Sequence, residues 1–517
     1  MTMQEESRRQ PVQPRCCPCA GAGGVSRRDF LKAGTIALGG LALGGCAWAA
    51  MREAAGAPAP APARQPLVVK PLFSYEMPRR HDKTSWRSWG GIETQGQANE
   101  EMVRLNGEFG KLAAAADFPV KFLPVSPVRG GGDVAKVDDL AGADVILLCP
   151  AGAGSDIFDA AVKTGKNVVF FLRHKSGPVY LWYEIISPRY LHGHSDRLVT
   201  KGVDNGDVVV DSMDELAWRL RALGGLKNAL GMRIITIGGA SGWACAEAPD
   251  LSRTKYKLDI QDVTYPQLAE LIKAARDDKA AVARAKERAA AYLNDGSLKL
   301  ETQPTYVENA FLLEQVFRGI MAKADAKAIT VNACMGTIMP IAETTACLTL
   351  SLLNDAGFLA FCESDFVVIP SGILLTQISG RPQFLNDPTY PHQGVITLAH
   401  CTAPRKMDGK ALEPARIMTH FESDYGASPK VEMKKGTKVT NIIPDFKAER
   451  YTGFVGEIAD APFLPICRSQ VDVAYKCPDA RIAENMPGFH WMTIYGDYIR
   501  EAAYALKRIP IAFENLG

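Results

Sequence analysis

Asp144-Val-Ile-Leu-Leu-Cys149 is followed by a Pro-Ala-Gly-Ala-Gly turn, and a second apolar run of the same kind returns at Asn167-Val-Val-Phe-Phe-Leu172. Strands that are buried on both faces of a sheet are continuously apolar, whereas strands with one wet face alternate. Residues 211–223 then show apolar side chains at helical spacing. Strands and helices that alternate in this way predict a parallel sheet with helices on both faces.

A second unit of this kind begins at Gly231. Met232-Arg-Ile-Ile-Thr-Ile237 predicts a strand, and it is followed by the glycine-rich turn Gly238-Gly-Ala-Ser-Gly-Trp243. This turn lacks the GxGxxG spacing of a dinucleotide site, so we interpret its glycines as allowing a tight connection. A further strand is expected at 257–260, and helices at Tyr265–Leu293 and Tyr306–Ala322.

The character of the sequence changes near Lys327. A strand is expected at 328–331, a helix over Pro340–Asp355, and a strand at Phe358-Leu-Ala-Phe-Cys362. The rest of the sequence predicts strands at 395–400, 415–421, 438–443, 451–458 and 469–474. One last helix is expected at 495–507. We therefore predict an α/β protein with two Rossmann-like α/β domains followed by a β-rich C-terminal domain. The expected segments are 1–50, 51–67, 68–230, 231–326 and 327–517.

The composition narrows the classes of protein. The 517 residues are enough for about three domains. The 59 Lys and Arg residues nearly balance the 57 Asp and Glu residues, giving a net charge of +2. Such a balance is not that of a protein which binds nucleic acid or an anionic membrane surface through its overall charge. The 12 cysteines are scattered, apart from a group near residue 17, and show no zinc-finger spacing.

The first 50 residues have the pattern of an export signal. Ser26-Arg-Arg-Asp-Phe-Leu-Lys32 precedes an uncharged apolar run from Ala33 to Gly45, which is too short to span a membrane. The paired arginines are typical of the twin-arginine route. Leu43-Gly-Gly-Cys46 is also similar to a lipobox, in which Cys46 would be lipidated; simple cleavage a few residues later is the alternative. Residues 51–67 form a tether rich in Pro and Ala. We expect a periplasmic or membrane-anchored protein.

Three residues stand out as candidates for chemistry. Glu363 directly follows an apolar strand, where open α/β sheets place their ligands. Asp387 lies in the turn-rich stretch Gly380–Pro388, which we interpret as a loop, and His490 follows a Pro-Gly break. Two carboxylates and one imidazole suit Mn²⁺ or Mg²⁺ better than a closed zinc site. The other histidines considered are His400, at a strand end, and His192 and His194, which are more typical of a solvated loop.

The segments around these residues resemble the L-fucose isomerase and L-arabinose isomerase superfamily, and most of all its fucose-isomerase-like branch. The similar segments are Phe361–Asp365, Ser379–Asp387, Leu398–Pro404 and Gly488–Asp497. The resemblance implies two α/β domains and a β-rich C-terminal domain, a divalent metal that is usually Mn²⁺, and a homo-oligomer. Glu363 and Asp387 would be both metal ligands and the catalytic acid/base pair. His490 would be the third ligand, while the role of His400 is left open.

The implied reaction interconverts an aldose and a ketose through an enediol. The metal would stabilise the negative charge on the sugar oxygens, while one carboxylate moves the proton and the other handles the hydroxyl. An export signal is unexpected in a family whose members serve cytoplasmic catabolism. Two alternatives therefore remain: a non-catalytic, membrane-tethered lipoprotein that binds sugar, and an exported oxidoreductase that binds a nucleotide cofactor.

Overall fold

The structure is a computed structural model that describes residues 61, 63–87, 91–152, 154–178, 180 and 185–517. The predicted export signal, Cys46 and most of the Pro/Ala tether lie outside these residues. Among the described helices, no single one is long and apolar enough to cross a membrane; one pair meets the criteria of length and composition together, but it is bent by 89°.

The first described unit is a parallel sheet flanked by helices. Its strands follow the order β2-β1-β4-β5-β6, with β3 paired to the free part of β1. The predicted strands are confirmed as β4 (Val145–Pro150) and β5 (Asn167–Leu172), and they are buried along almost their whole length. The other elements are β1 (Leu67–Ser74), α3 (Gln95–Ala115), β2 (Val120–Phe122), β3 (Ser126–Val128), α4 (Gly131–Val134), α5 (Ser155–Lys163), β6 (Val208–Val210) and α6 (Met213–Ala229).

The second unit is a four-stranded sheet in which all neighbours are parallel, in the order β11-β10-β7-β8. Two of its strands, β10 (Ala328–Val331) and β11 (Leu359–Cys362), come after Lys327. The boundary expected between residues 326 and 327 therefore separates strands that belong to the same sheet. The expected strand at 257–260 is found slightly later. The other elements are β7 (Arg233–Ile237), α7 (Ala248–Lys255), β8 (Asp259–Val263), α8 (Tyr265–Asp277), α9 (Lys279–Leu293), β9 (Leu298–Glu301), α10 (Pro304–Lys323), α11 (Cys334–Ala342), α12 (Ala346–Asp355) and α13 (Ile369–Ser379).

Two helices that we predicted as continuous are interrupted. The helix expected over Tyr265–Leu293 ends at Asp277, and a new one begins after Asp278, whose carboxylate accepts hydrogen bonds from the first-turn N–H groups of α9. An aspartate at this position satisfies donors that have no partner inside the helix. The helix expected over Pro340–Asp355 is likewise split, because Glu343 adopts a left-handed conformation (φ 51°) at the end of α11.

The C-terminal part forms a closed β-barrel. Its strands follow the order β16-β19-β12-β13-β18-β17, and β16 also pairs with β17, so the ring closes; β20 is added to β17. Every pair within the ring is antiparallel. A small sheet of β15, β14 and β9 lies beside it. The bounds are β12 (Gln383–Pro388), β13 (Val395–His400), β14 (Ala415–Met418), β15 (Ser428–Val431), β16 (Lys438–Pro444), β17 (Arg450–Asp460), β18 (Ser469–Ala474), α14 (Asp479–Ala483), β19 (Trp491–Tyr495), α15 (Ile499–Lys507) and β20 (Ala512–Asn515).

The stretch Gly380–Pro388, predicted as a loop, contains barrel strand β12. Gly380 does end a helix, in a left-handed conformation (φ 72°) at the C-cap of α13. The turn-forming residues Gly and Pro, however, only flank the buried segment Gln-Phe-Leu-Asn, which pairs with β19. The last helix also begins later than predicted, because Tyr495 ends β19 and α15 starts at Ile499.

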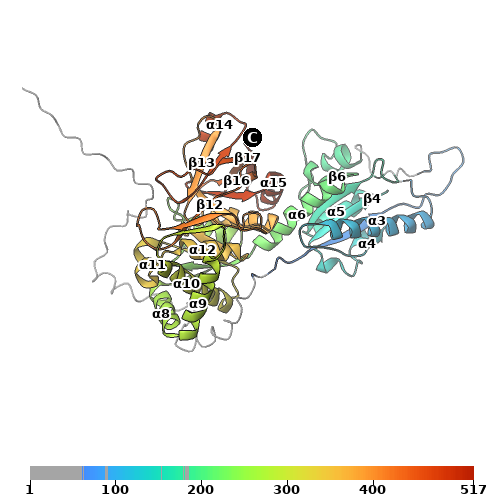
Figure 1. Ribbon diagram of the computed structural model, residues 1–517. Coiled ribbons are helices and arrows are strands. Elements are labelled where there is room, and N and C mark those ends of the chain that lie inside the picture. Colours follow the sequence, from blue (N-terminus) through green and yellow to red (C-terminus); the bar gives the residue numbers. More distant parts are fainter. Residues whose placement is uncertain (1–60, 62, 88–90, 153, 179, 181–184) are drawn as a thin grey trace, which may run out of the picture.

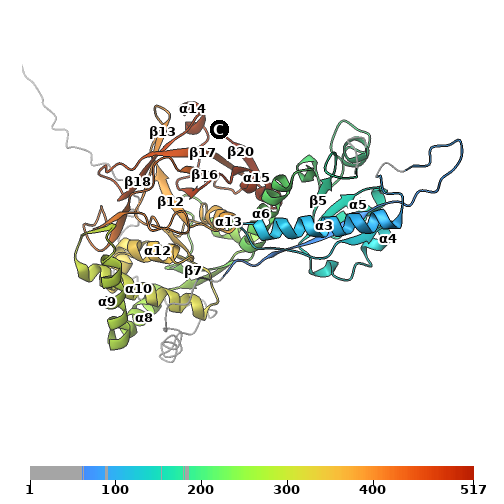
Figure 2. The same cartoon turned by 45° about the vertical axis from the view of Figure 1, so that its right-hand side comes forward.

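The first sheet stands to one side of the second sheet and the barrel, and helix α6 lies between them (Figures 1 and 2). Helix α6 packs against α13 of the second unit and α15 of the C-terminal part. The approach is close at Gly225, where a Cβ atom would lie 2.4 Å from the side chain of Ile378. Glycine in the middle of a helix lowers helix stability, so its presence here is explained by this contact. One apolar core runs through this junction.

Candidate metal and active site

Glu363 lies on a strained turn at the carboxyl end of β11. Both Glu363 (φ 65°) and Ser364 (φ 48°) have left-handed backbones, which side-chain-bearing residues seldom adopt. The turn is held from two sides. The Ser364 N–H donates to Thr330 Oγ1 (3.1 Å), and Ser241 accepts from the N–H of Phe366 (2.9 Å) while donating to the carbonyl of Ser364 (3.1 Å). Two such residues in succession cost on the order of 2–6 kcal/mol, and strain of this kind is typical of functional sites.

The other candidate residues come from three neighbouring barrel strands. Asp387 is near the end of β12, with Ala399 of β13 directly opposite. On the other side Asn386 pairs with Trp491, the first residue of β19. Continuing this antiparallel register by one step sets Asp387 opposite His490, and His400 closes β13 on the far side. The barrel therefore delivers one carboxylate and two imidazoles to one rim.

The predicted residues Glu363, Asp387 and His490 come together. His490 Nε2 lies 3.3 Å from Glu363 Oε2 and 3.3 Å from Asp387 Oδ1. His400, whose role was left open, joins them, since its Nε2 lies 3.6 Å from Glu363 Oε1. Both imidazoles are fully buried, whereas the Asp387 side chain is 22% exposed. A ligand can therefore reach the group from the side of Asp387.

Asp365 also belongs to this site and was not predicted. Its Oδ2 lies 2.7 Å from His490 Nδ1, and its Oδ1 accepts a hydrogen bond from the N–H of Val367 (3.0 Å). A buried carboxylate on Nδ1 leaves Nε2 to face Glu363 and Asp387, which is the arrangement by which proteins orient histidines that bind metals. In the sequence, the only sign was its position two residues after Glu363 at the same strand end.

The donor atoms fit a cation. Asp387 Oδ1, His400 Nε2 and His490 Nε2 are buried and have no hydrogen-bond partner among the described residues. Buried polar atoms without partners are costly, and a positive ion between them would satisfy all three. Asp387, His400 and His490 can each offer one donor atom to a shared ion, as can Cys362, Glu363 and His400. The residues present thus fit the divalent metal that the resemblance implies.

The charged groups of the site act strongly on one another's pKa values. Burial alone would raise the pKa of Glu363, but the two imidazoles that face its carboxylate hold this pKa well below its usual range. Burial raises the pKa of Asp387 to about 6, against the opposing effect of the nearby histidines. The pKa of His400 is raised to about 9 by Glu363 and Asp387 in spite of its burial, and that of His490 is raised by Asp365 and Glu363. A metal must therefore displace protons from the imidazoles when it binds.

The glycine-rich turn after β7 serves this site. Gly238 is left-handed (φ 81°), and a Cβ atom on Gly242 would lie 2.1 Å from the carbonyl oxygen of Cys245, which explains the tight turn we expected. The turn carries Trp243, whose ring stacks on Phe489 (centroids 4.6 Å apart) and meets His490 edge-on (5.5 Å). Two aromatic rings thus border the buried imidazole.

His192 and His194 are not part of this arrangement. They lie in the first α/β unit, where His194 is exposed and His192 half-buried. Neither belongs to any group of metal-binding side chains found in the described part of the chain.

Comparison with known proteins gives one distant similarity to report. The chain is 25% identical over 207 residues to a curated sulfoquinovose isomerase from Clostridium sp. (strain MSTE9). The aligned part covers 38% of this chain and 46% of that protein, so the chain spans about half the length of the curated relative it matches. No protein-family model matches the chain. Over part of its length, then, this chain is distantly similar to a sugar isomerase.

Proposed function

We propose that this protein is an exported, metal-dependent isomerase that interconverts an aldose and a ketose. One observation carries the proposal: Glu363 and Asp387 meet the buried imidazoles of His400 and His490 at one barrel rim, with oxygen-to-nitrogen distances of 3.3–3.6 Å. The similarity to a sulfoquinovose isomerase supports the class of substrate, a sugar.

Glu363, Asp387 and His490 would hold the metal, with His400 beside them. The mixture of carboxylate and imidazole donors is suited to Mn²⁺. When bound, such an ion supplies positive charge that stabilises the negative charge developing on two neighbouring sugar oxygens. Asp365 keeps His490 in the orientation that this requires.

Asp387 is suited to move the proton between the two carbons. It is the more exposed of the two carboxylates, with 22% of its side chain accessible against 11% for Glu363, so it is the one placed to reach the carbon that carries the proton. In the forward direction Asp387 takes the proton from C2 of the open-chain aldose and returns it to C1. The hydroxyl proton passes from the oxygen on C2 to the oxygen on C1. Glu363, with its low pKa, stays ionised and accepts a hydrogen bond from the hydroxyl.

Trp243 and Phe489 provide a wall for the sugar. Phe489 is 38% exposed and Trp243 half-buried, so the stacked pair can meet a ligand that enters beside His490. Aromatic faces pack well against apolar surface, and the pair would also keep water from the reacting carbons.

The remaining parts of the proposal concern the setting of the enzyme. The paired arginines Arg27 and Arg28 support export by the twin-arginine route to the periplasm, with Cys46 as the site of a lipid anchor. The family resemblance supports a homo-oligomer. Lysine at both arginine positions should keep the chain in the cytoplasm.

The test combines activity with an isotope. The full chain, purified without chelator and supplied with Mn²⁺, is incubated in D₂O with aldoses and ketoses, beginning with sulfoquinovose. Conversion should introduce solvent deuterium at C1 or C2, since the proton on Asp387 exchanges with water. Glu363→Gln should reduce turnover by about 10²–10⁴-fold without unfolding the protein.

Glu457→Gln provides the matched control, because Glu457 lies exposed on barrel strand β17. It should retain the activity of the parent. Full activity in Glu363→Gln, or conversion of the sugar without uptake of deuterium, would contradict the proposed mechanism.

A further inference from the structure

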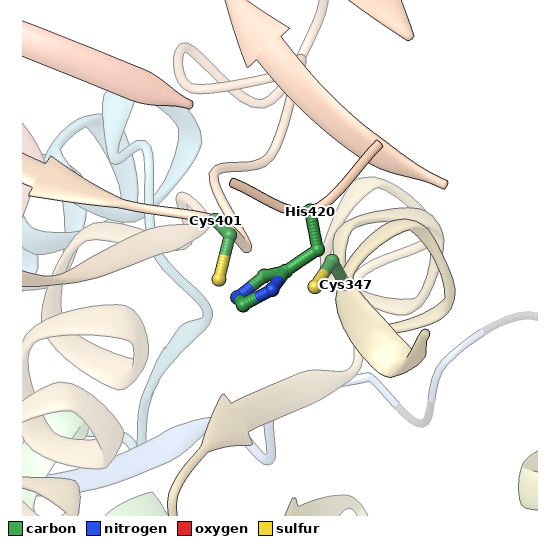
Figure 3. Close-up of side chains that lie close together, drawn as sticks. All are labelled: Cys347, Cys401 and His420. Atoms are coloured by element: carbon green, nitrogen blue, oxygen red, sulfur yellow. The ribbon is translucent and has the colours of Figure 1, made fainter. Parts of the chain in front are cut away.

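A second group of potential metal ligands lies next to the barrel and is not used by the reaction above. Cys347 is in the first turn of α12, Cys401 directly follows β13, and His420 follows β14. All three are at least 94% buried. Figure 3 shows the imidazole of His420 lying between the two sulfur atoms. Three separate elements thus bring soft donors to one point.

The geometry is close to that of a bound ion. One ligand atom from each residue lies within 4.8 Å of the other two. In a tetrahedral zinc site, metal–ligand distances of about 2.3 Å for sulfur and about 2.0 Å for nitrogen place the ligands roughly 3.5–3.8 Å apart. Side-chain movements of about 1 Å would therefore suffice. The ring of His420 is already oriented, because its Nδ1 lies 3.2 Å from Ser423 Oγ, leaving Nε2 for a ligand.

A fourth donor is close by. The Cys401 thiol interacts with the thiols of both Cys347 and Cys467, and Cys467 is itself buried. Cys467 comes from a fourth element, since it lies just before β18. Three thiols and an imidazole form one of the ligand sets of structural zinc sites.

Packing alone explains this group less well. A buried cysteine is ordinary as a small apolar residue, but a buried imidazole needs partners, and thiols are weak ones. A cation held between the imidazole and the thiols would give each of these donor atoms a strong partner.

We propose that Cys347, Cys401 and His420, with Cys467 as fourth ligand, form a second metal site for a thiophilic divalent cation of the zinc class. On binding, the thiols release their protons to solvent and the sulfur and nitrogen atoms donate to the ion; no oxidation is involved. The site differs from the Glu363 site in its ligands, which are soft where the other donors are mainly oxygen atoms.

The two sites meet at two consecutive residues, His400 and Cys401. Cys401 is the residue after His400, and its Sγ lies 4.0 Å from His400 Nδ1. An ion on Cys401 would tie the end of β13 to α12 and to the segment after β14. It would thereby fix the backbone that carries His400.

The experiment uses cobalt as a probe of the full chain. Co²⁺ bound to thiolates gives a sulfur-to-metal charge-transfer absorption in the near ultraviolet, which Co²⁺ bound to carboxylates and imidazoles does not. The parent should show this band and, when purified without chelator, about one equivalent of zinc. Both should be lost in Cys347→Ser and in His420→Gln, and kept in Cys477→Ser, a half-buried cysteine of the same barrel region.

Glu363→Gln separates the two sites. It should keep the charge-transfer band while losing Mn²⁺, so a failure of the proposed isomerase leaves this test intact. If Cys347→Ser does not fold, the folded His420→Gln variant decides. An unchanged band in either folded variant would overturn the proposal, as would a zinc-free parent in which two of Cys347, Cys401 and Cys467 are joined in a disulfide or all three react as ordinary free thiols.

Discussion

Replacing Asp365 by asparagine tests how the protein orients His490. The substitution keeps the size of the side chain, and the Val367 N–H will continue to bind the oxygen it now contacts at 3.0 Å. The new NH₂ group must then face His490 Nδ1, which lies 2.7 Å from the oxygen it replaces. Two donors cannot bond to each other, so Nδ1 gives up its proton and the imidazole keeps its proton on Nε2. The nitrogen that faces Glu363 and Asp387 is then blocked.

The size of the effect follows from the lost hydrogen bond. A buried hydrogen bond to a charged group contributes about 1.5–3 kcal/mol, which corresponds to roughly 10–150-fold in affinity. Removing partners of this kind typically costs 10–100-fold in metal affinity. We therefore expect Asp365→Asn to weaken Mn²⁺ binding by about 10–100-fold and turnover at limiting Mn²⁺ by a similar factor.

Free Mn²⁺ can be titrated directly, because the aqueous ion gives an electron paramagnetic resonance signal that disappears on binding. The matched control is Asp472→Asn. Asp472 also lies in the barrel and accepts a short hydrogen bond, from Thr397 Oγ1 at 2.6 Å, but does not contact the histidines of the site. The Asp472→Asn variant should bind Mn²⁺ with an affinity within about twofold of that of the parent. Equal affinities in Asp365→Asn and the parent would refute the assigned role of Asp365.

Three further predictions concern stability and substrate binding. Burial raises the pKa of Asp355 to about 7 from 3.8, so between these pH values the folded state holds a proton that the unfolded state has lost. The free energy of unfolding should therefore fall as the pH rises through this range. Measured by urea titration and relative to Asp355→Asn, the parent should lose up to about 4 kcal/mol of unfolding free energy between pH 4 and pH 8. Mn²⁺ at about 100 times its Kd should raise the unfolding free energy by about 2.7 kcal/mol, and chelator or Glu363→Gln should abolish this gain in thermal melts. Trp243→Ala should raise KM by about tenfold with little change in kcat, because it removes a wall of the site and no reacting group; a fall in kcat alone would disprove this.

The sequence predicted those parts of the fold in which local pattern and tertiary environment agree. Phe358–Cys362 is continuously apolar, and its last four residues are found as the buried parallel strand β11, with Glu363 following it as expected. The strands 395–400 and 469–474 were predicted at their observed bounds. The segment Gln383–Pro388 was misjudged because its flanking Gly and Pro residues dominate the local pattern, while its pairing with β19 depends on residues about 100 positions away.

The site shows the same limit. Glu363, Asp387 and His490 could be proposed together from the sequence because of a resemblance, and the structure places them within hydrogen-bonding range of one another. Asp365 and Trp243 were missed as members of the site, since their roles depend on contacts with His490 that no periodicity reveals. The thiols of Cys347 and Cys401 were counted as scattered for the same reason.

The closing of the barrel determines when, during synthesis and folding, the metal site can form. His490 enters the site only when β19 inserts between β12 and β16, and β19 is among the last strands to be synthesised. Until then the nascent chain already contains Glu363 and Asp387, but the imidazole of His490, which faces both carboxylates, is not yet in the site. Metal loading would therefore report that β19 has been made and has taken its place in the barrel. For a protein exported in the folded state, as we propose, a bound metal at this site would mark chains whose barrel has closed before they are translocated.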